Sequence, residues 1–189
     1  CMPPRRQKLC VHFLENNNQI KKLNSQVNLR EAFIKSAAAE TFFSWYYYKS
    51  KDSKGNELDN TLKAGTIPPE FLRSMFYTFG DYRDFLFGTD ISKGHGKESA
   101  LGKKIDSLFK NGDQKPPNGK TRQEWWTEYS HEIWEAMLCA LVKIGAKKDY
   151  LTENYGYNNV KFSDKSTTLE KFAKRPQFLR WLTEWYDDY

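Results

Sequence analysis

Residues 121–144 read TRQEWWTEYSHEIWEAMLCALVKI, and this stretch decides the fold class. Thr121 can cap a helix, and Glu124 three residues later completes a capping box. Apolar residues then recur at steps of three or four, as on one face of a helix: Trp125, Tyr129, Ile133, Met137, Leu141 and Ile144. That face is widened by Trp126, Trp134, Leu138 and Val142. We therefore predict a long helix that ends at Gly145, is buried on most sides and is covered by the other segments.

The other apolar patterns also have the period of a helix. Four more helices are predicted, over residues 9–15, 28–49, 68–88 and 97–111. Asn28 is the expected cap of the second of these. A last helix begins near Thr168 and is interrupted at Pro176, and its inward stripe comprises Phe178, Trp181, Leu182 and Trp185. No stretch of any length alternates with the period of a strand, so the sequence predicts an all-α helical bundle in one unit, residues 1–189.

Long polar segments separate these helices. We predict them as loops, over residues 50–65, 89–97, 112–120 and 147–168, with room for one helical turn in the first. Two features inside the helices stand out. Residues 42–48 read FFSWYYY, a cluster too broad to be buried on one face, so some of its rings face another layer or solvent. Gly80 weakens its helix by about 1 kcal/mol relative to alanine, which indicates a kink or a close packing contact there.

Composition narrows the class of partner. The chain has 189 residues, 39% hydrophobic and 16% aromatic, with a formal net charge of +6 and a pI near 9.1. The positive net charge favours an acidic partner, such as a sulfated glycan or an anionic membrane. The alternative is that the charge serves solubility alone. A candidate basic patch comprises Arg5, Arg6, Lys8, Lys103, Lys104, Lys147, Lys148, Lys171, Lys174 and Arg175. No known signature of nucleic-acid binding accompanies it, and the longest apolar run, 136–142, is too short to span a bilayer.

The three cysteines are Cys1, Cys10 and Cys139. Because the count is odd, at least one thiol is free or pairs outside the chain. Cys1 and Cys10 are disulfide candidates, either with each other or with missing sequence. A loop this short would restrict the unfolded chain by roughly 2.5–3 kcal/mol on the entropy model. Cys139 sits mid-helix among apolar residues, so we expect a buried thiol there.

Motifs that resemble catalytic or cofactor sites fail at single residues. Gly119-Lys120-Thr121 resembles the end of a phosphate-binding loop, but Gln114 stands where the first glycine is required. His131-Glu132 begins like a zinc-protease motif, but Glu135 replaces the second histidine. We therefore expect no catalytic site, no bound metal ion and no cofactor.

Six blocks, read together, resemble one family. The opening CMPPRRQKLC at 1–10 looks like the signature that begins the second subdomain of Duffy-binding-like adhesion domains. Later blocks are similar to the same family: AAAETFF (37–43), PPEFLR (68–73) with GDYRD (80–84), EWW (124–126), IWEAMLCAL (133–141) and RPQFLRW (175–181). They are most like the blocks of the erythrocyte membrane protein 1 family of the malaria parasite. The form of residues 80–84 resembles the beta, gamma or delta subclasses rather than alpha.

That resemblance implies an all-helical, disulfide-bearing extracellular module without enzyme activity. The chain would be the central part of a larger domain, displayed on the infected red cell by a membrane-anchored protein and binding a host cell-surface receptor protein such as intercellular adhesion molecule 1. Members of the family differ mostly in their loops, so we expect contacts there. Two alternatives remain open: binding of a sulfated glycosaminoglycan, or a scaffold role with the receptor contacts in missing flanking subdomains.

Overall fold

The structure is a computed structural model that describes residues 2–51, 55–109 and 119–187. Its three long helices are α4 (Gln26–Lys51), α6 (Pro69–Phe87) and α8 (Arg122–Ile144). The shorter helices are α1 (Pro4–Gln7), α2 (His12–Glu15), α3 (Asn17–Ile20), α5 (Gly55–Lys63), α7 (Ala100–Phe109), α9 (Lys148–Tyr155), α10 (Leu169–Lys174) and α11 (Gln177–Asp187). Within the described ranges the extended structure is one antiparallel bridge between Lys161 and Thr168. The all-α prediction is confirmed.

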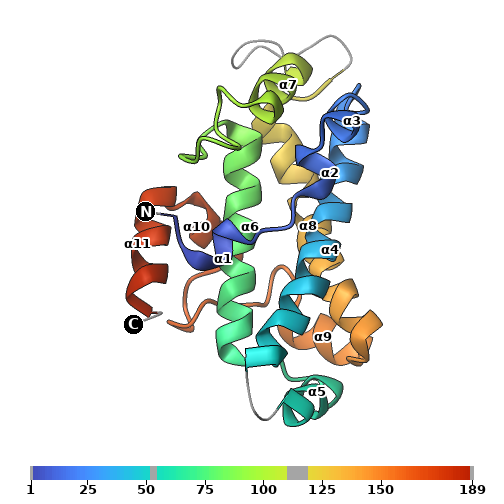
Figure 1. Ribbon diagram of the computed structural model, residues 1–189. Helices are drawn as coiled ribbons and strands as arrows, with labels where there is room; N and C mark the ends of the chain where they lie inside the picture. Colours follow the sequence, from blue (N-terminus) through green and yellow to red (C-terminus); the bar gives the residue numbers. More distant parts are fainter. Residues whose placement is uncertain (1, 52–54, 110–118, 188–189) are drawn as a thin grey trace.

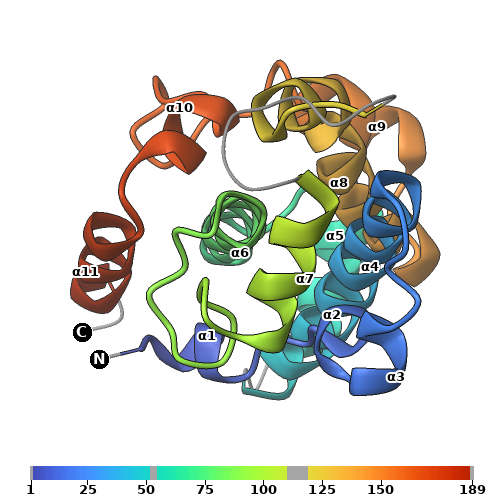
Figure 2. The same ribbon diagram turned by 90° about the horizontal axis from the view of Figure 1, so that it is seen from above.

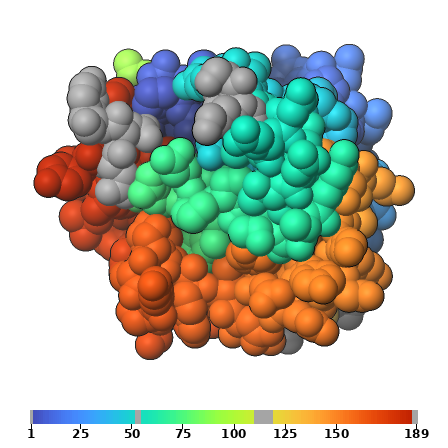
Figure 3. Space-filling view, turned by 90° about the horizontal axis from the view of Figure 1, so that it is seen from below, coloured from blue at the N-terminus to red at the C-terminus, as the bar shows by residue number. Residues whose placement is uncertain are grey.

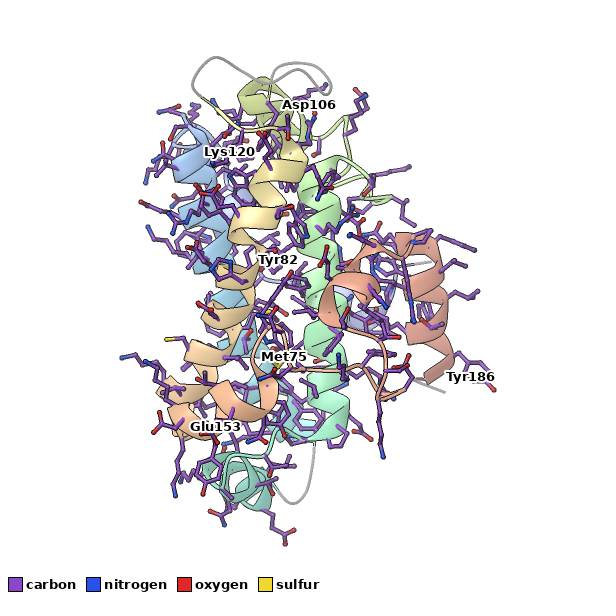
Figure 4. All side chains as sticks on the ribbon, turned by 180° about the vertical axis from the view of Figure 1, so that it is seen from behind. Met75, Tyr82, Asp106, Lys120, Glu153 and Tyr186 are labelled. Atoms are coloured by element: carbon purple, nitrogen blue, oxygen red, sulfur yellow. The ribbon has the colours of Figure 1, made fainter. Side chains whose placement is uncertain are left out.

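The central element of the bundle is α6. Seen end-on in Figure 2, it is surrounded by α4, α7, α8, α10 and α11. Its sequence explains this position, because aromatic and apolar residues occupy nearly its whole circumference: Phe71, Met75, Phe76, Tyr77, Phe79, Tyr82, Phe85 and Leu86 are buried. Met75 and Tyr82 point from α6 into the interior (Figure 4). The expectation that the helix over 121–144 is the covered one is therefore corrected.

Helix α8 forms as predicted but keeps a solvent face. Its capping box is present, with the Glu124 N–H donating to Thr121 Oγ1 and the Thr121 N–H donating to the Glu124 carboxylate. It packs chiefly along α4 (Figure 1), where the Phe33 and Trp125 ring centroids lie 5.6 Å apart. The opposite side is exposed at Glu135, Cys139 and Lys143.

Helix α4 begins earlier than predicted. It starts at Gln26, and the N–H of Asn28 donates to Ser25 Oγ at 3.1 Å, so Ser25 rather than Asn28 receives this first-turn bond. The rings of residues 42–48 divide as expected. Trp45 is buried against Phe71, at 5.0 Å between centroids, whereas other rings of the cluster reach solvent: Phe42, Phe43, Tyr46 and Tyr47.

Two segments predicted as loops contain helices. Helix α5 lies within 50–65 and α9 within 147–168, and they sit side by side at one end of the molecule (Figure 3). Gly65, at φ +95°, marks the contact, because a Cβ there would lie 2.7 Å from Tyr150 Cβ. Residues 89–97 are not helical, as predicted. The predicted loop over 112–120 falls mostly outside the described residues.

As predicted, the chain breaks at Pro176, which separates α10 from α11. The prediction of which residues of α11 face inward is partly wrong. Trp181 is buried, whereas Phe178 and Leu182 are 63% and 55% exposed. The face of α11 that meets α6 is instead mostly polar, with Gln177, Arg180 and Glu184 buried. The expected close packing at Gly80 is present there, because a Cβ at this position would lie 2.6 Å from Arg180 Nε.

Candidate functional site

A groove of about 800 Å³ lies between α1, α4, α6 and α11. This volume falls in the range of ligand-binding clefts. Its walls combine rings and charges, and its principal lining residues are Arg5, Lys8, Glu40, Phe43, Tyr47 and Lys51. Helix α4 supplies the last four, which are spaced so that one side of the helix faces the groove.

The floor of the groove is held by Arg5. Its guanidinium donates to Glu184 at 2.6 and 3.0 Å, to Asp81 Oδ2 at 2.9 Å and to Thr78 Oγ1 at 3.1 Å. Burial alone would lower the pKa of Arg5, but the charges of Glu184 and Asp81 outweigh it and hold the pKa above its ordinary value. Arg5 is thus a fixed cross-link between α1, α6 and α11, and its charge is compensated.

Behind the floor, a second set of polar contacts joins the same elements. Arg6 Nη2 lies 3.0 Å from Asp90 Oδ2, and Gln177 Nε2 donates to both Asp81 and Asp90, at 3.1 and 2.9 Å. Trp181 Nε1 also donates to Asp81, at 3.1 Å. Asp81 therefore accepts from α1 and α11 at once, which makes it the centre of the network.

Glu40 links α4 to the turn after α1. Its carboxylate accepts the backbone N–H of Cys10 at 2.6 Å. The side chain is nevertheless buried, and burial raises the pKa of Glu40 to about 7, because the hydrogen bond from Cys10 offsets it only in part. At neutral pH this carboxyl is thus only partly charged.

The rim of the groove carries exposed rings and two lysines. Lys8 donates to the Tyr47 hydroxyl, and its Nζ lies 4.0 Å from the centroid of the Tyr47 ring. Lys51 Nζ lies 4.6 Å from the same centroid. Hydrogen bonds from Lys8 and then Lys51 lower the pKa of the Tyr47 hydroxyl. Phe43, one turn before Tyr47, is 59% exposed.

The candidate basic patch is not one surface. Arg5 and Arg6 are committed to internal ion pairs, and Lys8 lies at the groove. Lys103 and Lys104 are on α7, whereas Lys147 and Lys148 are at α9 toward the opposite end of the bundle (Figure 1). The remaining members lie on or beside α10, where Lys174 pairs with Glu170 and Arg175 with Asp164. Basic residues that are close together in the sequence therefore form several separate groups on the structure and not one patch.

Of the predictions for the cysteines, the one for Cys139 is wrong and the one for Cys1 and Cys10 is not tested. Cys139 is exposed rather than buried, because it lies on the solvent side of α8 between Glu135 and Lys143. Cys10 is half-buried and forms no disulfide with another described residue. Cys1 falls outside the described residues, so its pairing with Cys10 or with other sequence stays a prediction. Within the described ranges no three His, Cys, Asp or Glu side chains gather as metal ligands.

Comparison with known proteins decides the family. The family model of the Duffy binding domain matches residues 1–180. The chain belongs to the Duffy-binding family. Two curated relatives are similar over the full chain: the Duffy receptor of Plasmodium vivax (strain Salvador I), 26% identical over 193 residues, and the Duffy receptor alpha form of Plasmodium knowlesi, 26% identical over 198 residues. The chain spans 15% of the length of each relative.

In this member of the Duffy-binding family, the groove could be predicted only in part from the sequence. The FFSWYYY cluster indicated solvent-facing rings, and Phe43 and Tyr47 are two of them. The convergence of Lys8 and Lys51 on one ring was missed, since 43 positions separate residues 8 and 51 and no local pattern joins them. No helix in the described part of the chain is long and apolar enough to cross a membrane.

Proposed function

We propose that this chain is a receptor-binding adhesion module of a malaria parasite, and that its partner is a host cell-surface protein. The observation that carries the proposal is the family match over residues 1–180. The printed names of both relatives, each a Duffy receptor, support it. The groove supplies what such a module needs, namely a concave surface with exposed rings on a rigid helical frame.

More finely, we propose a place in the parasite's erythrocyte membrane protein 1 family, in a beta-, gamma- or delta-like subclass. The chain would be the central part of a larger extracellular domain on the infected red cell, and membrane attachment would come from other parts of that protein. Cytoadherence to endothelium, with intercellular adhesion molecule 1 as one receptor, is the function this placement suggests. The module would act by binding alone, without catalysis.

The test is binding of the fluorescently labelled chain to endothelial cells and red cells, measured by flow cytometry. We expect binding that is lost after the cells are treated with trypsin and kept after enzymatic removal of their glycosaminoglycans. The opposite pattern would assign a sulfated glycan as the partner, although the separation of the lysine clusters gives that alternative no structural support. If only an intact parent domain binds, the chain is a scaffold and its flanking subdomains hold the contacts.

A further inference from the structure

The groove has an open apolar wall. Phe43 is 59% exposed and Tyr47 is 42% exposed; they stand one turn apart on α4, and the buried ring of Phe71 lines the same groove. Covering these rings would remove apolar surface from water, so an apolar group seated here would contribute affinity. A ligand without an apolar part would leave these rings in water.

The same wall carries positive charge. Lys8 and Lys51 both lie over the Tyr47 ring, and among the described residues neither ammonium has a carboxylate within 4.0 Å. Arg5, by contrast, is paired with Asp81 and Glu184. Tyr47, one turn after Phe43 on α4, therefore holds two ammonium groups that have no carboxylate partner among the described residues.

The negative groups of the groove do not cancel this charge. Glu184 is bonded to Arg5, and Glu40 is buried with a pKa of about 7. Glu70 also lines the groove and is exposed, but it stands at the start of α6 rather than on α4 beside Lys51. An acidic ligand would accordingly place its carboxylates toward Lys8 and Lys51, with its apolar group toward Phe43.

We propose that the groove binds an acidic peptide segment of the host receptor, in which an apolar side chain packs on Phe43 and Tyr47 while neighbouring carboxylates pair with Lys8 and Lys51. This inference rests on the proposed adhesion function and names the surface and the chemistry through which it acts. A sulfated glycan fits less well, because it would meet the lysines but leave the rings uncovered.

The experiment titrates the folded chain with defined peptides and follows binding by calorimetry. The test peptide has one phenylalanine flanked on both sides by glutamates. A second peptide replaces its glutamates with lysines, and a third replaces its phenylalanine with alanine. We expect binding of the first alone, since the second reverses the charges and the third removes the apolar contact.

Two matched double variants locate the site. Lys8→Gln with Lys51→Gln removes two charges at the groove, and Lys103→Gln with Lys104→Gln removes two from α7 at the far end of the bundle. We expect the groove variant to bind the acidic peptide roughly tenfold more weakly. The α7 variant should match the parent chain, and Phe43→Ser should weaken binding without removing a charge. Circular dichroism establishes that each variant is folded.

Several results would overturn the inference. They are equal binding of the acidic and basic peptides, equal loss in the two double variants, no peptide binding by the folded parent chain, or capture of heparin with the acidic peptide excluded. The proposed adhesion function is tested separately, by the cell-binding assay. If cells bind the parent chain and the groove variant equally, adhesion stands and the groove is not its site. If cells bind neither chain, while the acidic peptide binds the parent chain but binds the groove variant only weakly, the groove stands and the adhesion role fails.

Discussion

At the scale of single residues, Glu40 makes stability depend on pH. Its pKa is about 7 in the folded chain against an ordinary 4.5, so the folded state keeps a proton that the unfolded state has lost between those values. Its contribution to stability is therefore highest below about pH 4.5 and falls as pH rises to about 7. At about 1.4 kcal/mol per pKa unit, the fall amounts to as much as ~3 kcal/mol.

We predict that Glu40→Gln removes this decline, because the amide oxygen can still accept the Cys10 N–H and cannot ionise. Urea unfolding followed by circular dichroism, at pH about 5 and about 8, should show a smaller change in the free energy of unfolding than in the parent chain. Glu31→Gln, at an exposed ion pair with Lys35, is the control and should retain the parental slope. The account of Glu40 fails if both variants keep that slope.

Gly80 tests the packing of α11 on α6. A methyl group at position 80 would lie 2.6 Å from Arg180 Nε, whereas nothing lies within 4 Å of the same position at Gly94. We predict that Gly80→Ala destabilises the chain by about 1–3 kcal/mol, as overpacking does, and that Gly94→Ala leaves stability nearly unchanged. Thermal unfolding of the two variants makes the comparison, and equal melting temperatures would refute the close contact.

At the scale of elements, α11 is attached to the bundle mainly through polar groups. Asp81 accepts from Arg5, Gln177 and Trp181 while almost fully buried. We predict that Asp81→Asn lowers the free energy of unfolding by about 3 kcal/mol, the lower end for a broken buried pair, because Glu184 still holds Arg5. Urea titration measures it, with Glu170→Gln at the exposed pair with Lys174 as a control expected to change stability by less than about 0.5 kcal/mol. A similar small loss in both variants would show that the network is not structural.

The same helix shows where prediction from sequence reached its limit. The long helices were predictable because their apolar residues repeat with a strong period, and Thr121 and Gly88 mark ends that local chemistry dictates. On α11 the period pointed to Phe178 and Leu182, but the network around Asp81 turns Arg180 and Glu184 inward instead. Which face of α11 is buried depends on contacts with residues far away in the sequence, and a local pattern of apolar residues carries no information about them.

Segments with few buried residues were missed for a related reason. Helices α5 and α9 bury one residue each, Leu62 and Leu151, so polar composition concealed them. At the groove, the exposed rings were foreseen but their lysine partners were not. Fold and scaffold thus followed from local periodicity, whereas the candidate site arises from contacts between α1 and α4 that only the tertiary structure establishes.

At the scale of the whole molecule, the net charge of +6 is spread over separated clusters. Only Lys8 and Lys51 belong to the proposed peptide site. We therefore predict a shallow salt dependence, in which a plot of log affinity for the acidic peptide against log salt concentration has a slope of magnitude below about two, because a short peptide has two charge contacts to screen and no condensed counterions to release. Calorimetric titrations over a series of sodium chloride concentrations measure it, and a slope several times steeper would indicate a polyanion surface instead.

The central claim is that this member of the Duffy-binding family adheres to host cells through the groove beside Tyr47. The most direct measurement is flow cytometry of trypsin-sensitive cell binding by the parent chain, the Lys8→Gln, Lys51→Gln variant and the Lys103→Gln, Lys104→Gln variant. We predict that the parent and the α7 variant bind alike and that the groove variant binds roughly tenfold more weakly. Equal binding by all three chains, or binding by none, would contradict it.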